Sequence, residues 1–112
     1  MIQQPTIGDS CVNKPTTDEI TVRLYKQMED GKWEDFQQDY GLEDFAGFLP
    51  AVGDMILEPG VLQGLDRYKA ENRKMLTVVQ RIFNPRDLPN YVVLVVTEHT
   101  PEGREATAVS IR

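Results

Sequence analysis

The residues of this 112-residue chain that could do acid–base chemistry are carboxylates in adjacent pairs. The pairs are Glu29/Asp30, Glu34/Asp35 and Glu43/Asp44. Neighbouring residues of a strand point to opposite faces, so the two members of a pair do not converge on one substrate. A β-hairpin could instead turn Asp30 or Glu34 toward Asp54. That arrangement would suit a small carboxylate-dependent hydrolase or a ligand-binding barrel, and it is the one catalytic possibility in this sequence.

Other residues with catalytic or metal-binding chemistry are scarce. Neither Ser10 nor Ser110 has the Gly-x-Ser-x-Gly turn that exposes a nucleophile, and no spacing brings Cys11 to His99. One cysteine and one histidine are too few for a zinc site of four ligands. Gly64 is not followed by the lysine and hydroxyl of a P-loop. We therefore expect a protein that is not an enzyme and that has no metal and no cofactor.

Residues 29–48, which we call the acidic-aromatic lobe, carry the whole net charge of −6, with seven acids against one lysine. The lobe also contains the only tryptophan and three of the four phenylalanines. Acids beside exposed aromatic rings can bind a basic protein through salt bridges, cation–π contacts and buried anchors. This pattern predicts a protein-interaction module, and the expected partner-binding residues are Trp33, Glu34, Asp35, Glu43 and Asp44.

The alternative is that the aromatic residues of the lobe fill the core while its acids are solvated. We expect residues 42–49 to form an aromatic plug in the core and residues 28–38 to form a surface hairpin. The first place to look for the site is therefore Trp33 with its two neighbouring acids.

The acidic charge balance argues against nucleic acid or an anionic membrane as the partner, because phosphate binding needs clustered Lys and Arg. A single cysteine excludes an intrachain disulfide framework. The N-terminus does not resemble a signal peptide, and the longest apolar run, residues 92–96, is far shorter than the ~20 residues of a membrane helix. We expect a cytoplasmic protein.

Alternating apolar residues predict a strand over 20–25, and Asp30-Gly31 predicts a hairpin turn into a return strand over 32–38. Trp33, Phe36 and Tyr40 also have the spacing of a helical stripe. The hairpin is the preferred interpretation because Gly31 favours the turn.

The remaining elements follow from composition and turn residues. One or two helical turns are expected in 42–49, a strand in 55–57, and a short helix or ordered excursion in 61–71. Long strands are expected over 74–83 and 91–97, with a bulge or barrel rim at Gln80 and Arg81, and a final strand over 105–111.

These elements predict a mainly β fold. We expect a small SH3-like barrel or a strongly curved antiparallel sheet of five to six strands, with one short helix or ordered excursion. Residues 1–18 would be an N-terminal arm and residues 19–112 a single small β domain.

The order of strand, excursion, strand, turn and strand resembles SH3-like barrels. The order of Gly53-Asp54, strand 55–57, strand 75–83, Asn84-Pro85 and strand 91–96 also resembles the small head-to-tail adaptor proteins of tailed phages. That resemblance implies an alternative function, a structural subunit that assembles with copies of itself through strand edges.

Overall fold

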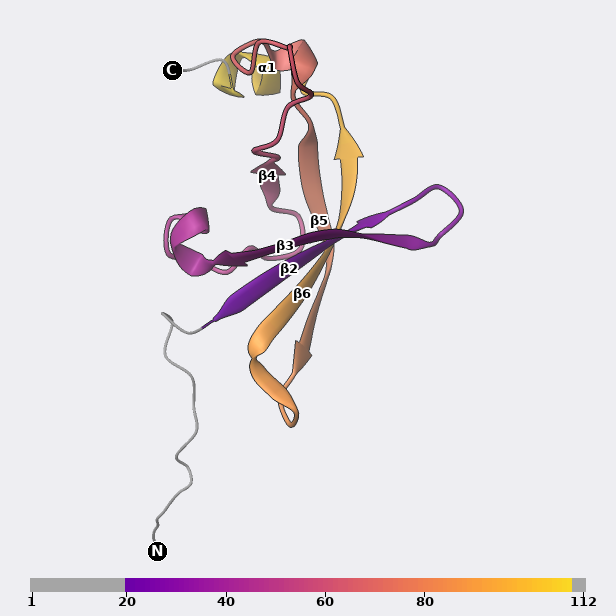
Figure 1. Cartoon of the computed structure of the whole chain (residues 1–112), viewed down its shortest axis with the longest axis vertical. Coiled ribbons are helices and arrows are strands. Elements are labelled where there is room, and N and C mark those ends of the chain that lie inside the picture. Colours follow the sequence, from indigo (N-terminus) through magenta and orange to yellow (C-terminus); the bar gives the residue numbers. More distant parts are fainter. Residues whose placement is uncertain (1–19, 110–112) are drawn as a thin grey trace, which may run out of the picture.

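The computed structural model describes residues 20–109, and Figure 1 shows their arrangement. The strands are β2 (Thr21–Gln27), β3 (Trp33–Gly41), β4 (Met55–Leu57), β5 (Met75–Asn84) and β6 (Leu88–His99). The helical elements are the 3-10 turns η3 (Leu42–Phe45) and η4 (Ala70–Asn72) and the α-helix α1 (Arg104–Val109).

The five strands form one sheet in the order β3-β2-β6-β5-β4. The sheet twists so strongly that the β2–β3 ribbon crosses the β5–β6 ribbon, which gives a half-barrel (Figure 1). The predicted mainly β fold with a strongly curved sheet is confirmed. The sheet is mixed, however, because β2 and β6 pair in parallel while the other three pairs are antiparallel.

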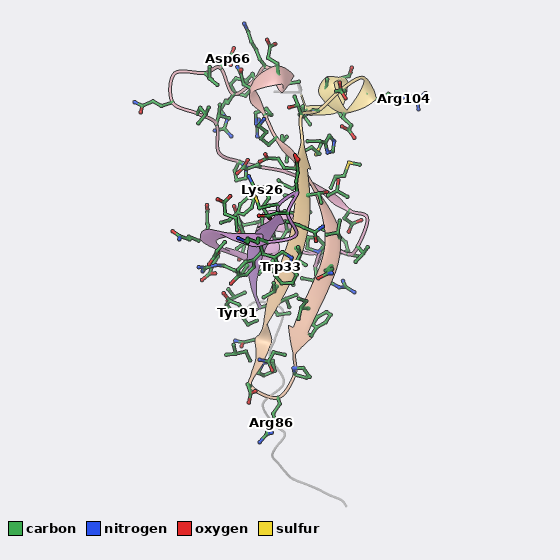
Figure 2. All side chains as sticks on the ribbon, turned by 90° about the vertical axis from the view of Figure 1, so that its right-hand side faces the viewer. Lys26, Trp33, Asp66, Arg86, Tyr91 and Arg104 are labelled. Atoms are coloured by element: carbon green, nitrogen blue, oxygen red, sulfur yellow. The ribbon has the colours of Figure 1, made fainter. Side chains whose placement is uncertain are left out.

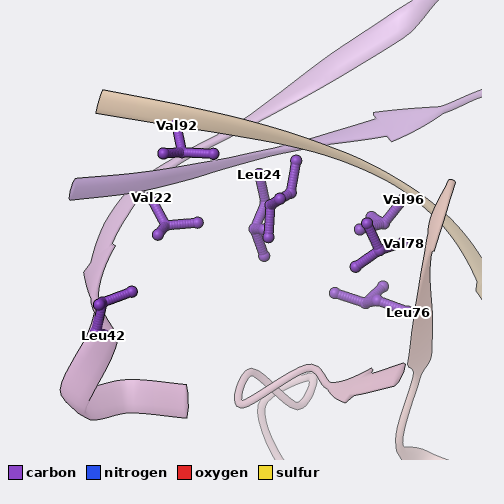
Figure 3. Close-up of a cluster of buried hydrophobic side chains, with 8 residues drawn as sticks. Val22, Leu24, Leu42, Leu76, Val78, Val92 and Val96 are labelled. Atoms are coloured by element: carbon purple, nitrogen blue, oxygen red, sulfur yellow. The ribbon is translucent and has the colours of Figure 1, made fainter. Parts of the chain in front are cut away.

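The parallel pair forms the centre of the core. In its register Val22 lies beside Val92 and Leu24 beside Leu94, so both strands turn apolar side chains to the concave face. Figure 3 shows these side chains converging with those of β5 and η3. The buried cluster consists of Val22, Leu24, Leu42, Leu76, Val78, Val92, Leu94 and Val96. Removing this apolar surface from water is the main stabilising contribution to the half-barrel.

The predicted hairpin between β2 and β3 is confirmed. Gly31 has φ of +86°, and the Met28 N–H donates to the Lys32 carbonyl at 2.8 Å. The side chain of Asp30 accepts from the Lys32 N–H at 2.9 Å, as Asp commonly does in turns. Farther along, the register jumps between Arg23 and Tyr25, which leaves a bulge in β3 opposite Leu24.

The hairpin of β5 and β6 is the longest feature of the sheet (Figure 1). Its register shifts between Val78 and Gln80, which confirms the predicted bulge at this position. β4 pairs with β5 only from Met75 to Thr77. The part of the hairpin beyond the bulge therefore extends past the edge strand.

The segment between β4 and β5 is an ordered excursion, as predicted for residues 61–71, and it ends in η4. Arg73 anchors it: only 6% of this residue is exposed, and its guanidinium donates to the carbonyls of Arg67 and Glu58 at 2.9 and 3.0 Å.

The prediction of a final strand over 105–111 is wrong for residues 105–109, which belong to α1. Ala and Glu are good helix formers, and the alternation of small Ala106 and Ala108 gave only a weak strand signal. His99 Nε2 lies 2.8 Å from Glu105 Oε1, which ties the helix to the end of β6. Residues 110–111 and the predicted N-terminal arm, 1–18, lie outside the described residues. Within residues 20–109, none of the helices has the length and apolar character needed to cross a membrane.

Candidate functional site

The structure divides the acidic-aromatic lobe into two separate surfaces. Trp33, Glu34 and Asp35 begin β3, whereas Glu43 and Asp44 lie in η3, after the last residue of the strand. Figure 1 shows the β2–β3 turn and η3 at opposite ends of this strand. The five predicted partner-binding residues are therefore not brought together, and each surface has to be judged separately.

Trp33 is 45% exposed, which agrees with the expected surface position of this hairpin. Its ring packs at a tilt against Tyr25, with 6.3 Å between the ring centroids. The adjacent Glu34 forms an ion pair with Lys26 across the hairpin, at 3.5 Å between Oε1 and Nζ. This end of the strand offers one aromatic face and one exposed carboxylate.

Asp35 is held by contacts within the fold. Both of its oxygens accept from Arg23, at 2.9 Å from Nε and 3.0 Å from Nη2, and Oδ1 also accepts from the Gln37 N–H at 2.7 Å. The hydrogen bonds from Arg23, and then the one from Gln37, lower the pKa of Asp35 below its ordinary value. A carboxylate with three hydrogen bonds has little capacity left for a partner.

The second surface is a groove between η3 and β4, with a cavity volume of about 470 Å³. We call it the η3–β4 groove, and its lining residues include Asp44, Phe45, Phe48, Asp54, Met55 and Ile56. Leu42 is buried as expected for the aromatic plug, but Phe48 is 75% exposed, so the expectation that the whole plug is core is wrong. The chain turns outward before Phe48, where Ala46 and Gly47 both have positive φ.

The two carboxylates of the groove are positioned by main-chain donors. Asp44 Oδ2 accepts from the Gly41 N–H at 2.9 Å, and Asp54 Oδ2 accepts from the Ala51 N–H at 2.8 Å. The second oxygen of each makes no hydrogen bond to any residue of the described range. The groove thus presents fixed carboxylates beside apolar walls, an arrangement that can accept an Arg or Lys attached to an apolar side chain. Glu43 is exposed but does not line the groove, and its carboxylate lies over Gly41.

A third cluster places three glutamates around Lys26. Its Nζ lies 3.5 Å from Glu34 Oε1 and 3.7 Å from Glu98 Oε1, and Glu58 lines the same cavity of about 260 Å³. Burial, and then the neighbouring charge of Glu98, raise the pKa of Glu58. Sequence reasoning missed Glu58 and Glu98, because they lie far apart in the chain and only the sheet brings them together.

The pairing of Asp30 or Glu34 with Asp54 does not occur. Glu34 lines the cavity around Lys26, Asp54 lines the η3–β4 groove, and Asp30 accepts a main-chain bond within its own turn. Between residues 20 and 109, no group of three or more His, Cys, Asp or Glu side chains has an arrangement that could hold a metal ion. Ser10, Cys11 and Ser110 lie outside that range.

Comparison of the chain with models of protein families, with curated proteins and with solved structures gives no match. The function must therefore be argued from the arrangement of the side chains themselves.

Proposed function

We propose that this protein is a non-enzymatic protein-interaction module whose acidic-aromatic lobe binds a basic segment of another polypeptide in the η3–β4 groove. The observation that carries the proposal is the exposure of Phe48, of which 75% is accessible, beside the carboxylate of Asp44. A large aromatic ring left in water next to a fixed negative charge is a common feature of surfaces that bind partners.

The chemistry of the groove defines the partner. Its apolar side would cover Phe45, Phe48 and Met55, and a neighbouring Arg or Lys would reach the unused oxygens of Asp44 and Asp54. Aromatic and arginine anchors contribute most of the binding free energy in many interfaces. The net charge of −6 would also attract a basic segment over a longer range and increase its association rate.

Trp33 and Glu34 are the second candidate contact within the same lobe. They offer an aromatic face and an exposed carboxylate, but the ring already packs against Tyr25 and the carboxylate already pairs with Lys26. We therefore assign the principal contact to the groove and a supporting contact to the start of β3.

The test uses a fluorescently labelled synthetic peptide of alternating Arg and Leu, titrated with the full chain and followed by fluorescence anisotropy. Phe48→Ser and Asp44→Asn should each weaken binding at least about tenfold, as loss of a central anchor does. Asn keeps an oxygen that can accept from the Gly41 N–H, so Asp44→Asn changes charge with little change of structure.

Trp33→Ser is the matched control in the lobe, and Leu62→Ser, at another exposed apolar residue, is the control outside it. Trp33→Ser should have a smaller effect than Phe48→Ser, and Leu62→Ser should have none. Added salt should weaken binding of the unaltered chain. Binding that survives both groove substitutions, or that fails only with Trp33→Ser, would refute the assignment to the groove.

A further inference from the structure

The free end of the β5–β6 hairpin, residues 80–90, exposes apolar side chains on both faces. Ile82 and Phe83 are adjacent in β5 and so point to opposite faces, and 52% of Phe83 is accessible. Leu88 adds a third exposed apolar residue at the start of β6. Apart from β6, no strand in the described part of the chain pairs with β5 beyond Val78, so the outer edge of β5 is also open there.

β6 pairs with β2 from Tyr91 to Val96, so residues 80–83 of β5 belong to the sheet and only residues 84–90 extend beyond it. The outer edge of β5, open and flanked by exposed apolar side chains, is available for pairing with another chain. Such an edge is more stable when a partner covers it. The charges of this segment show which kind of surface would do so.

The free end is basic, whereas the acidic-aromatic lobe is acidic. Between residues 80 and 90 the charged residues are Arg81, Arg86 and Asp87, which give a net charge of +1, against −6 for residues 29–48. The guanidinium of Arg81 lies 5.3 Å from the centroid of the Phe83 ring. The hairpin therefore already presents the combination that the η3–β4 groove is suited to accept, a cation attached to an aromatic ring.

Neither Arg81 nor Phe83 lines the η3–β4 groove of its own molecule. In Figure 1 the turn of the β5–β6 hairpin lies at the lower end of the molecule, well away from η3 and β4. Figure 2 shows Arg86 at that same extremity of the ribbon. We therefore consider a contact in which the hairpin of one molecule meets the groove of another.

We infer that the basic partner of the η3–β4 groove is a second copy of this chain, which inserts Arg81 and Phe83 from the free end of its β5–β6 hairpin. This inference rests on the proposed function, since it names the partner of the same groove. The contact joins two different surfaces, so in a pair of molecules one copy keeps an unused hairpin and the other keeps an unused groove. Such heterologous contacts build a closed ring or an open filament.

The test measures self-association of the full chain by analytical ultracentrifugation across micromolar to high micromolar concentrations. One variant blocks the hairpin (Arg81→Glu with Phe83→Ser) and the other blocks the groove (Asp44→Asn with Phe48→Ser). The unaltered chain should form species larger than a dimer, more strongly at low salt. Each variant alone should associate at least about tenfold more weakly.

Mixing the two variants is the decisive step. The hairpin-blocked chain keeps its groove and the groove-blocked chain keeps its hairpin, so the mixture should give a 1:1 dimer that grows no further. Leu62→Ser should leave the self-association of the unaltered chain unchanged, and circular dichroism confirms that each variant is folded.

A monomer at every concentration would overturn the inference. So would a groove-blocked chain that still associates with itself, because that would mean edge-to-edge pairing of β5 with β5. Either result leaves the proposed function standing if the Arg-Leu peptide still binds the groove. If the peptide fails to bind while the variants form the mixed dimer, the general affinity for basic segments is refuted instead.

Discussion

The guanidinium of Arg23 on β2 donates two parallel hydrogen bonds to the carboxylate of Asp35 on β3, at 2.9 and 3.0 Å. Its third nitrogen donates to Asp39 at 2.8 Å. The two carboxylates flank the bulge of β3, since Asp35 pairs in register with Tyr25 and Asp39 with Arg23 itself. Asp35 Oδ1 also accepts from Gln37, whose φ is +59°. One arginine thus fixes the irregular part of the edge strand.

This relationship predicts acid sensitivity. Because Arg23 lowers the pKa of Asp35 from 3.8, the ionised carboxylate stabilises the fold above that pH, and the stabilisation is lost as the pH falls through the lowered pKa. Asp35→Asn should therefore reduce the free energy of unfolding at pH 7 and flatten its dependence between about pH 5 and about pH 2. Urea unfolding at a series of pH values measures both.

The matched control is Asp39→Asn, which removes a carboxylate that has only one hydrogen bond to Arg23 and is more exposed. It should change the stability less. An equal effect of the two substitutions would contradict the special role of the paired contact between Arg23 and Asp35.

Glu58 should have the opposite effect to Asp35 on how the stability of the fold depends on pH. Burial and the charge of Glu98 raise its pKa above 4.5, so the folded state binds a proton more readily than the unfolded state does. The stability of the fold therefore falls as the pH rises through the raised pKa of Glu58, and the ionised carboxylate of Glu58 destabilises the fold at neutral pH. Glu58→Gln should raise the urea midpoint at pH 7, and the gain should shrink toward about pH 4.

Lys26 offsets part of this destabilisation, because its positive charge favours the ionised form of Glu58. Lys26→Gln should therefore make the loss of stability between acidic and neutral pH larger. Glu102→Gln, at an exposed acid outside the cluster, is the control and should leave the urea midpoint at pH 7 unchanged. A Glu58→Gln chain less stable than the original at pH 7 would contradict the argument.

Arg73 should be the residue on which the excursion between β4 and β5 depends most. Its buried guanidinium bonds the carbonyls of Arg67 and Glu58, and hydrogen bonds of a charged donor are worth more than neutral ones. Arg73→Ala should cost about 2 kcal/mol of unfolding free energy, measured by urea denaturation. Hydrogen exchange should increase over residues 58–74.

Arg67→Ala tests the specificity of that prediction. Arg67 lies in the same excursion but is exposed, and its side chain donates to the Pro59 carbonyl at 3.2 Å. Its loss should cost less than about 0.5 kcal/mol. Equal costs at the two positions would mean that burial of Arg73 is not what anchors the segment.

The elements that were predicted correctly are those whose signal is local. Alternation in 20–25, the Asp30-Gly31 turn and the polar break at Gln80 each act within a few residues, and the structure has a strand, a turn and a bulge there. The parallel pairing of β2 with β6 has no local signal, because it joins residues about 70 positions apart. A mixed sheet could not be distinguished from an antiparallel one in advance.

The candidate site was predictable in composition but not in placement. Acids and aromatic rings do occur together, yet which rings are buried depends on the turn after η3. Leu42 and Phe48 both belong to the predicted plug, but only Leu42 is buried, because the backbone reverses at Ala46 and Gly47. Asp54 joins the groove through the following loop, ten residues after Asp44 in the sequence.

That reversal gives the last prediction. Ala46, at φ of +58°, adopts a left-handed conformation that costs a residue with a Cβ about 1 kcal/mol, whereas glycine adopts it freely. Ala46→Gly should therefore leave stability unchanged or raise it by up to about 1 kcal/mol, after the extra entropy of the unfolded chain is counted.

Gly47→Ala, at the next residue, should have the opposite effect. Gly47 has φ of +84°, and a Cβ added there would meet no atom within 4 Å, so any destabilisation comes from the backbone conformation alone. We expect a loss of about 1 kcal/mol, measured by urea denaturation. Because Phe48 follows directly, strain at Gly47 should also weaken binding of the Arg-Leu peptide, whereas Ala46→Gly should preserve it. A Gly47→Ala chain with unchanged stability and binding would show that this turn does not position Phe48.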